Sequence, residues 1–320
     1  MTASKKPHVI ALAGGVGGAK LADGLAQLLG PNLTVVVNTG DDFEHLGVRI
    51  SPDLDTVMYT LAGIADPVQG WGIKGETWTF MDQVARLGGA DWFRLGDRDL
   101  ATHAVRTSRL ASGDTLTAIT RDLCAALGIA AHVLPMSDDD VRTMVTSGEQ
   151  VLAFQEYFVR LRCAVPVTRL SYEGAAAARL NPALTAEIAP SAIVICPSNP
   201  YLSIDPILAV PDLRDWLVAK RAPIVAVSPI VGGAAIKGPA AKIMAELGIE
   251  VSATAVAEHY RGLIDGIVLD HTDAALRGEI EALGMAVLVT QTVMKSGADR
   301  AALARDCLAF ADVLAGRDAT

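Results

Sequence analysis

The segment from His8 to Leu29, HVIALAGGVGGAKLADGLAQLL, predicts a strand, a glycine turn and a helix in direct succession. Its first six residues are nearly all apolar, four glycines occupy the next five positions, and the leucines that follow recur at helical spacing. The apolar run Leu33–Val37 then predicts a second buried strand. Together these elements predict a βαβ unit at the start of the fold.

The carboxyl half continues this alternation. Four apolar strand candidates, in AIVICPSNP, PIVAVSPIVGG, DGIVLD and AVLVTQTVM, are separated by helical stretches. Strands and helices in alternation are typical of a mostly parallel sheet with helices on both faces, so we predict an α/β fold. Ligands of such sheets bind in the crevice at the carboxyl ends of the strands.

The middle of the chain has a different pattern. From Trp71 to Ile129 the sequence favours helices and has few β-branched runs, which predicts a small helical insertion. We therefore assign residues 1–66 and 130–320 to the α/β core and residues 67–129 to the insertion. Beyond it, the alternation of Phe154, Glu156, Phe158 and Arg160 predicts a strand.

Charge and composition exclude several classes of function. With 36 acidic and 27 basic residues the net charge is −9, so the protein as a whole repels nucleic acid. No run approaches the roughly 18 apolar residues that a membrane span needs. The four cysteines are far apart and the glycine-broken start is unlike a signal peptide, so we expect a reduced, cytoplasmic protein with no membrane or nucleic-acid partner.

The glycine turn is the first candidate site. Unpaired amides at the start of a helix bind anions, and Gly15, Gly17, Gly18 and Lys20 are the candidate ligand contacts. The turn is no Walker A loop, because Leu21 follows the lysine, and Lys20 also occupies the place of the third glycine of the dinucleotide fingerprint. A tight turn with close packing is the alternative explanation of these glycines.

Four aspartates follow the second strand within fifteen positions. Asp41 and Asp42 lie on a loop, where carboxylates bind a hard cation such as Mg²⁺ together with ligand phosphates. Asp53 and Asp55 fall in the first turn of a helix predicted to begin at Pro52, a place where the helix dipole alone favours carboxylates. Because residues two apart on a helix point to different sides, we expect one of these two to face the ligand of the preceding loop.

Two loops of the carboxyl half are further candidates, and each ends a predicted strand. The loop Pro197–Ile207 presents hydroxyls and amides, and the loop Ser228–Lys242 places a lysine among glycines ahead of a helix, which favours phosphate binding. The candidate residues are Ser198, Asn199, Ser228, Gly232, Gly233, Lys237 and Gly238.

The insertion carries aromatic residues and an arginine. Trp71, Trp78 and Trp92 can stack on a flat heterocycle, with Arg94 as a hydrogen-bond donor, or they can pack the insertion on the core. No histidine lies in a nucleophile–base pattern and GxSxG is absent, which disfavours a hydrolytic triad.

Eight segments in register resemble the 2-phospho-L-lactate transferase family, called CofD in archaea and FbiA in mycobacteria, from about Val9 to about Val293. They are AGGVGGAKLADGL, VNTGDD, GVRISPDLDTVMYTLAG, GWGIKGETW, WFRLGDRDLATH, FQEYFV, PSNPYLSIDPIL and SPIVGGAAIKGPAAKIM. The resemblance implies a Rossmann-like core with a small helical domain, a homodimer, and a Mg²⁺-dependent transferase of coenzyme F420 biosynthesis. Such enzymes join a phospho-acid from a guanosine diphosphate conjugate to the ribityl hydroxyl of the deazaflavin Fo, and GMP leaves.

The resemblance also implies roles for particular residues. Asp55 and Arg94 match the positions that contact Fo, and the two carboxyl-half loops match those that hold the guanosine diphosphate. We expect Mg²⁺ near Asp41, Asp42 or Asp53, with Asp55 or Asp42 as the catalytic carboxylate. Which aspartate binds metal and which acts as base stays open, as does the identity of the acid: lactyl, enolpyruvyl or glyceryl.

Two other functions are compatible with parts of the pattern. The βαβ start and the acidic residue after the second strand also suit a nicotinamide-dependent oxidoreductase, although the fingerprint is imperfect. A nonenzymatic nucleotide-binding regulator would share the glycine turn and the carboxyl-half loops but has no need of Asp55 and Arg94.

Overall fold

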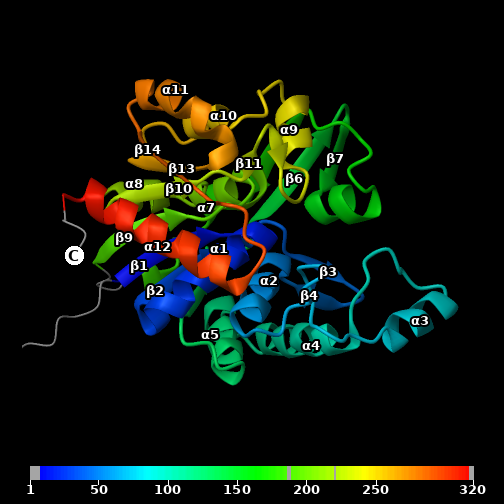
Figure 1. Ribbon diagram of the computed structural model, residues 1–320. Coiled ribbons are helices and arrows are strands. Elements are labelled where there is room, and N and C mark those ends of the chain that lie inside the picture. The colour runs from blue at the N-terminus through cyan, green and yellow to red at the C-terminus, as the bar shows by residue number, and fades with distance from the viewer. Residues whose placement is uncertain (1–7, 186–188, 220, 317–320) are drawn as a thin grey trace, which may run out of the picture.

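A seven-stranded parallel sheet forms the centre of the protein in the computed structural model, which describes residues 8–185, 189–219 and 221–316 (Figure 1). The first seven residues, on which the expectation about a signal peptide partly rests, lie outside the described residues. The strands are β1 (His8–Ala13), β2 (Leu33–Val37), β5 (His132–Pro135), β9 (Pro190–Ile195), β10 (Ile224–Val227), β13 (Gly266–Asp270) and β14 (Ala286–Thr290). The predicted α/β, Rossmann-like class with a mostly parallel sheet is confirmed.

The strand order reverses in the middle of this sheet. In space the order is β14-β13-β10-β9-β1-β2-β5, so the chain builds outward from β1 in one direction and from β9 in the other. Such a switch point leaves the loops after the two neighbouring strands diverging, and a crevice opens between them. The loops in question are those after Ala13 and after Ile195, which include the glycine turn and the first predicted carboxyl-half loop.

Helices cover both faces of the sheet, as its nearly continuous apolar strands require. One face carries α1 (Gly15–Leu29), α2 (Pro52–Leu61), α5 (Leu116–Ala126) and α12 (Gly297–Leu314). On it α1 and α12 pack so closely that a Cβ on Gly24 would lie 2.1 Å from the Arg300 carbonyl oxygen. The other face carries α6 (Pro182–Thr185), α7 (Asp205–Leu208), α8 (Leu213–Ala219), α9 (Ala240–Glu246), α10 (Ala253–His259) and α11 (Arg277–Ala282).

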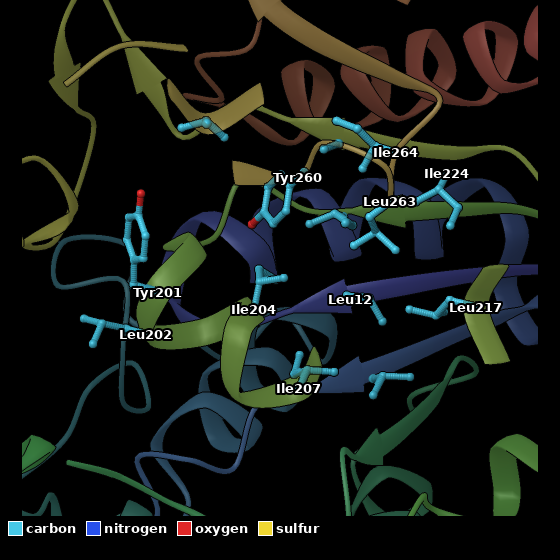
Figure 2. Close-up of a cluster of buried hydrophobic side chains, with 14 of the residues drawn as sticks. Leu12, Tyr201, Leu202, Ile204, Ile207, Leu217, Ile224, Tyr260, Leu263 and Ile264 are labelled. Carbon is cyan, nitrogen blue, oxygen red and sulfur yellow. The ribbon is translucent and has the colours of Figure 1, made fainter. Parts of the chain in front are cut away.

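The core on the second face fixes the loop that follows β9. Figure 2 shows Leu12 of β1 in one buried cluster with Ile204 and Ile207, at the end of that loop, and with Leu217 of α8 and Tyr260. All five side chains are almost completely buried. Burial of such side chains contributes about 1.5–3 kcal/mol each, so this packing holds the loop Pro197–Ile207 firmly against the end of β1.

Two helices of the predicted insertion extend away from the sheet (Figure 1). The helix α3 (Thr79–Arg86) and the helix α4 (Asp97–Ala111) share a small core with the hairpin of β3 (Phe43–His45) and β4 (Val48–Ile50). The third helix, α5, packs against β5 of the central sheet. The domain boundaries at residues 67 and 129 stay a prediction.

A three-stranded antiparallel sheet of β6 (Arg142–Ser147), β7 (Gln150–Ala153) and β8 (Arg169–Glu173) borders the second face. Between β7 and β8 the predicted strand is wrong, because Glu156–Arg160 forms a π-helical turn. The rings of Phe154 and Phe158 stack with centroids 5.3 Å apart, which is a contact of helical rather than strand spacing.

Candidate functional site

A cavity of about 460 Å³ opens at the switch point of the sheet. This volume is within the range of pockets that bind nucleotides and other small ligands. Its walls come from the glycine turn, the loop after β9, the start of α2, the insertion, the π-helical turn and the second carboxyl-half loop. The segments that the sequence singled out separately thus meet at one place.

Close packing explains most of the glycines in the turn. The Ser198 hydroxyl accepts a hydrogen bond from the Gly14 amide at 3.0 Å and donates to the Gly14 carbonyl oxygen at 2.8 Å. A Cβ on Gly17 would lie 2.4 Å from the Pro197 carbonyl oxygen, and one on Gly18 would lie 2.3 Å from the Ser198 hydroxyl. The backbones at the ends of β1 and β9 therefore touch, which larger residues would prevent.

Most residues of the turn also border the cavity. Gly15, Gly17 and Lys20 line it, whereas Gly18 packs against Ser198 and does not. The Gly15 amide donates to Asp53 Oδ1 at 2.6 Å, so this amide of the helix start is already bound to a carboxylate. Anion contact by the turn stays a prediction for the remaining positions.

Asp41 and Asp53 lie together on the cavity wall. The Asn38 side-chain amide is 3.1 Å from Asp41 Oδ1 and 3.0 Å from Asp53 Oδ2, and the Gln155 amide is 3.3 Å from Asp41 Oδ2. Within the part of the chain that the structure describes, neither carboxylate forms an ion pair. Burial raises the pKa of Asp53 to about 6, and burial together with the charges of Asp53 and Asp42 raises the pKa of Asp41 well above its ordinary value.

Asp42 points elsewhere. It borders a second, smaller cavity of about 60 Å³ and does not line the main one. The Ser51 hydroxyl, at the N-cap of α2, donates to Asp42 Oδ2 at 2.6 Å, while the buried Oδ1 has no hydrogen-bond partner among the described residues. Burial raises the pKa of Asp42 to about 7. Of the three aspartates predicted to hold Mg²⁺, the structure thus brings two together.

Both aspartates at the start of α2 line the main cavity, but only Asp53 lies beside Asp41, with which it shares the Asn38 amide. That one of the two faces the ligand of the preceding loop stays a prediction. The helix begins at the cavity wall, and side chains of its first turn border the cavity on two sides. Asp53 meets the glycine turn, while Asp55 meets α4: Arg106 binds both oxygens of Asp55, from Nη1 at 3.1 Å to Oδ2 and from Nη2 to Oδ1.

Three further residues were missed in the sequence: Asp99 and His103 on this wall, and Arg106 behind it. His103 lies between two carboxylates, with Nδ1 3.5 Å from Asp55 Oδ2 and Nε2 3.4 Å from Asp99 Oδ2. Burial opposes the charge of Asp99, but hydrogen bonds and charge from His103 lower the pKa of Asp99 overall. The signal was present: Asp99, His103 and Arg106 recur at i, i+4 and i+7, which is one face of α4.

These carboxylates form two groups that fit a cation. One is Asp41 with Asp53, which have no basic partner among the described residues. In the other, Asp55, Asp99 and His103 offer ligand atoms within 4.8 Å of one another, but Arg106 already compensates Asp55. The uncompensated first group suits a hard divalent cation better. The ligands of Mg²⁺ stay a prediction.

The glycine turn and the second carboxyl-half loop each bring a lysine to the same cavity. Lys20 Nζ donates to the Met294 carbonyl oxygen at 3.0 Å, and Lys237 Nζ is 3.4 Å from the Gln69 carbonyl oxygen. Burial, followed by the charges of Lys237 and Arg300, lowers the pKa of Lys20. Neither lysine forms an ion pair with a described residue, so both can bind an anionic ligand.

The remaining candidates of these loops divide in two groups. Ser198, Asn199, Ser228, Lys237 and Gly238 line the cavity. Gly232 and Gly233 do not; they form the turn between the short strands β11 (Ile230–Val231) and β12 (Ala234–Ala235), and the Gly232 amide is bound to the Asp273 carboxylate. Their predicted contact with a ligand is not supported by this placement.

The aromatic residues of the insertion also divide. Arg94 and Trp71 line the cavity, and the guanidinium of Arg94 lies 4.5 Å from the centre of the Trp78 ring. Trp92 instead packs with Phe43, as the packing alternative predicted. Arg94 is thus placed at the cavity with a side chain that is half exposed.

The buried carboxylates predict an unusual dependence of stability on pH. Asp42 and Asp53 have pKa values of about 7 and about 6 in the folded protein, against an ordinary 3.8. The folded state therefore retains protons that the unfolded chain has lost, and its stability, fully present below about pH 4, falls as the pH rises to about 7. We expect a decline on the order of a few kcal/mol in denaturant unfolding without divalent metal, at about 1.4 kcal/mol per pKa unit. A profile that is flat between pH 4 and 7 would contradict the prediction.

Comparison with known proteins finds one family along nearly the whole chain. The sequence profile of the family described as 2-phospho-L-lactate transferase CofD matches residues 9–293. A phosphoenolpyruvate transferase of Kitasatospora aureofaciens is 42% identical over 314 residues, covering 95% of this chain and 98% of the relative. A 2-phospho-L-lactate transferase of Methanosarcina mazei is 40% identical over 290 residues, covering 90% and 95%.

Solved structures support the fold. Protein BH3568 from Bacillus halodurans superposes with a TM-score of 0.61 at 16% identity, covering 95% of this chain and all of that one. At this identity the likeness shows the fold alone. No helix of the described residues combines the length and the apolar character that crossing a membrane demands.

Proposed function

Because the chain belongs to the CofD family of 2-phospho-L-lactate transferases, we propose that it transfers a phospho-acid group to the deazaflavin Fo in coenzyme F420 biosynthesis. The donor is a guanosine diphosphate that carries lactate, enolpyruvate or glycerate on its terminal phosphate. The ribityl hydroxyl oxygen attacks that phosphorus, the bond from phosphorus to the bridging oxygen breaks, and GMP leaves. The hydroxyl proton passes to a base.

The presence of both carboxylates and lysines on the wall of the cavity supports this reaction. Within the described residues, Asp41 and Asp53 are carboxylates without a basic partner and Lys20 and Lys237 are cations without an acidic one, yet all four line the same cavity. Lysines bind the diphosphate of the donor as point charges. Uncompensated carboxylates would repel the same diphosphate unless a cation lies between them, and Asp41 and Asp53 are the residues that would hold Mg²⁺. When bound, Mg²⁺ neutralises charge on the transferred group.

The remaining residues position the acceptor. Asp55 lines the cavity on the side of the insertion, where Arg94 and Trp71 also lie. A carboxylate there accepts a hydrogen bond from the ribityl hydroxyl and orients its oxygen in line with the phosphorus. The arginine donates to a carbonyl oxygen of the heterocycle. Ser198, Asn199 and Ser228 supply hydroxyl and amide groups for the nucleotide.

A competition between donors tests the proposal. Purified protein is mixed with Mg²⁺, Fo and equal amounts of the three guanosine diphosphate conjugates, and the mass of the deazaflavin product is read. We expect one dominant product and an equal amount of GMP, and none of either when EDTA is added. Relatives at about 40% identity carry both the phosphoenolpyruvate and the 2-phospho-L-lactate name, so the product mass decides the acid.

Other outcomes favour other functions. Absence of product, with neither Fo nor guanine nucleotide bound, would contradict the transferase proposal and favour the nucleotide-binding regulator. NAD released from the purified protein on denaturation would favour the oxidoreductase.

A further inference from the structure

A buried arginine supports the cavity wall from behind. Arg106 is 1% exposed and does not line the cavity, whereas Asp55, to which it is bound, does. Its two terminal nitrogens bind the two oxygens of Asp55, and Nη1 also lies 3.4 Å from the Arg49 carbonyl oxygen. A bidentate arginine restricts rotation of the carboxylate that it binds, so Asp55 is held in one orientation.

The orientation matters because of what remains free on Asp55. A carboxylate has about four lone-pair positions, and a bidentate arginine uses one on each oxygen. His103 lies at 3.5 Å from Oδ2, and the Tyr59 hydroxyl donates to Asp99 Oδ1 at 2.5 Å, so the neighbours of this pair are themselves fixed. The part of Asp55 that faces the cavity is thus presented at a constant angle.

We infer that Arg106 is a positioning residue for the transfer reaction: by holding both oxygens of Asp55 it aims the free lone pairs of this carboxylate at the acceptor hydroxyl. The inference rests on the proposed function, which places the acceptor beside Asp55. The alternative is that the ion pair only joins α4 to α2. The two roles differ in measurable ways, because a positioning role acts through Asp55 and affects turnover more than the fold.

The chain offers a matched control on the same helix. Arg109 lies in α4 and is bound to two carboxylates, Asp114 and Asp122, but it is partly exposed and does not line the cavity. The test compares the variants Arg106→Met and Arg106→Lys with the control variants Arg109→Met and Arg109→Lys. The readouts are kcat, the KM of donor and of Fo, and the unfolding midpoint.

For Arg106→Met we expect kcat to fall about 100-fold, the effect of a misplaced reactive group, with the KM of the donor unchanged. Arg106→Lys should recover part of the loss, because it restores the charge but not the fork of two nitrogens. The Arg109 variants should retain kcat. Should Arg106→Met fail to fold, Arg106→Lys still distinguishes the roles, since a loss of stability with wild-type kcat would indicate a structural role.

A double-mutant cycle gives the decisive result. In an Asp55→Asn background, Arg106→Met should change neither kcat nor the affinity for Fo. The affinity is measured from Fo fluorescence, so the cycle can be completed even if turnover is lost. The inference about Arg106 would be overturned if Arg106→Met lowered kcat or Fo affinity equally in the wild-type and Asp55→Asn backgrounds, or if the Arg106 variants behaved like the Arg109 variants. Either result would leave the proposed function standing. A wild-type protein that neither binds Fo nor forms product would refute the proposed function and the inference with it.

Discussion

Replacing Asp53 by Asn should lower turnover about 100- to 1,000-fold, the usual loss when one electrostatic contact to a reacting group is removed, while the metal-free protein becomes more stable. The gain in stability follows from burial, with no cationic partner among the described residues, which raises the pKa of Asp53 from 3.8 to about 6. That shift corresponds to roughly 3 kcal/mol at about 1.4 kcal/mol per unit. Because the side chains around the new asparagine must repack, part of this free energy is lost, and we expect the free energy of unfolding at pH 7 to rise by about 1–2 kcal/mol.

The hydrogen bonds of Asp53 permit this exchange. An asparagine oxygen can still accept from the Gly15 amide, and the two N–H groups of Asn38 keep two acceptors, Asp41 Oδ1 and the Leu202 carbonyl oxygen. The control is Asp215→Asn, in the first turn of α8, where the aspartate is exposed and does not line the cavity. We expect that change to alter stability by less than about 0.5 kcal/mol. A destabilised Asp53→Asn protein, or one with wild-type turnover, would contradict the prediction.

The sequence was sufficient for the central sheet and for the edge of it at which the main cavity opens. Apolar runs such as Leu33–Val37 predict strands reliably because both faces of a parallel sheet are buried, and the strand ends then define one edge where ligands bind. The prediction failed between β7 and β8, where Phe154 and Phe158 are four positions apart, a spacing that places two residues on the same side of a strand and also of a helical turn.

The orientation of individual side chains could not be predicted in the same way. Asp41 and Asp42 are adjacent, yet Asp41 lines the main cavity, whereas Asp42 points away from it and accepts a hydrogen bond from the Ser51 hydroxyl. The loop conformation sets this difference. Arg106 lies 51 positions from Asp55, and only the packing of α4 on α2 brings the two together. Contacts of this kind depend on tertiary structure, which a single sequence does not specify locally.

Replacing Asp55 by Asn, two residues from Asp53 in the same helical turn, should also reduce turnover about 100-fold or more, but with the opposite effect on stability. Asp55 is the carboxylate partner of the fully buried Arg106. An asparagine would leave the guanidinium charge without that partner in the protein interior, and loss of one member of a buried ion pair costs about 3–5 kcal/mol. Denaturant unfolding of Asp53→Asn and Asp55→Asn under identical metal-free conditions should therefore give changes of opposite sign.

Two controls separate charge compensation from other causes. Asp122→Asn breaks the partly exposed pair with Arg109 and should change stability by less than about 1 kcal/mol. The double variant Asp55→Asn with Arg106→Met removes both charges and should recover most of the lost stability without recovering turnover. Recovery of turnover in that double variant would mean that Asp55 serves the fold rather than the acceptor. Because the two aspartates share a helix turn and a cavity and differ in their partners, opposite stability changes would show that Arg106 determines how the protein tolerates a buried carboxylate at its site.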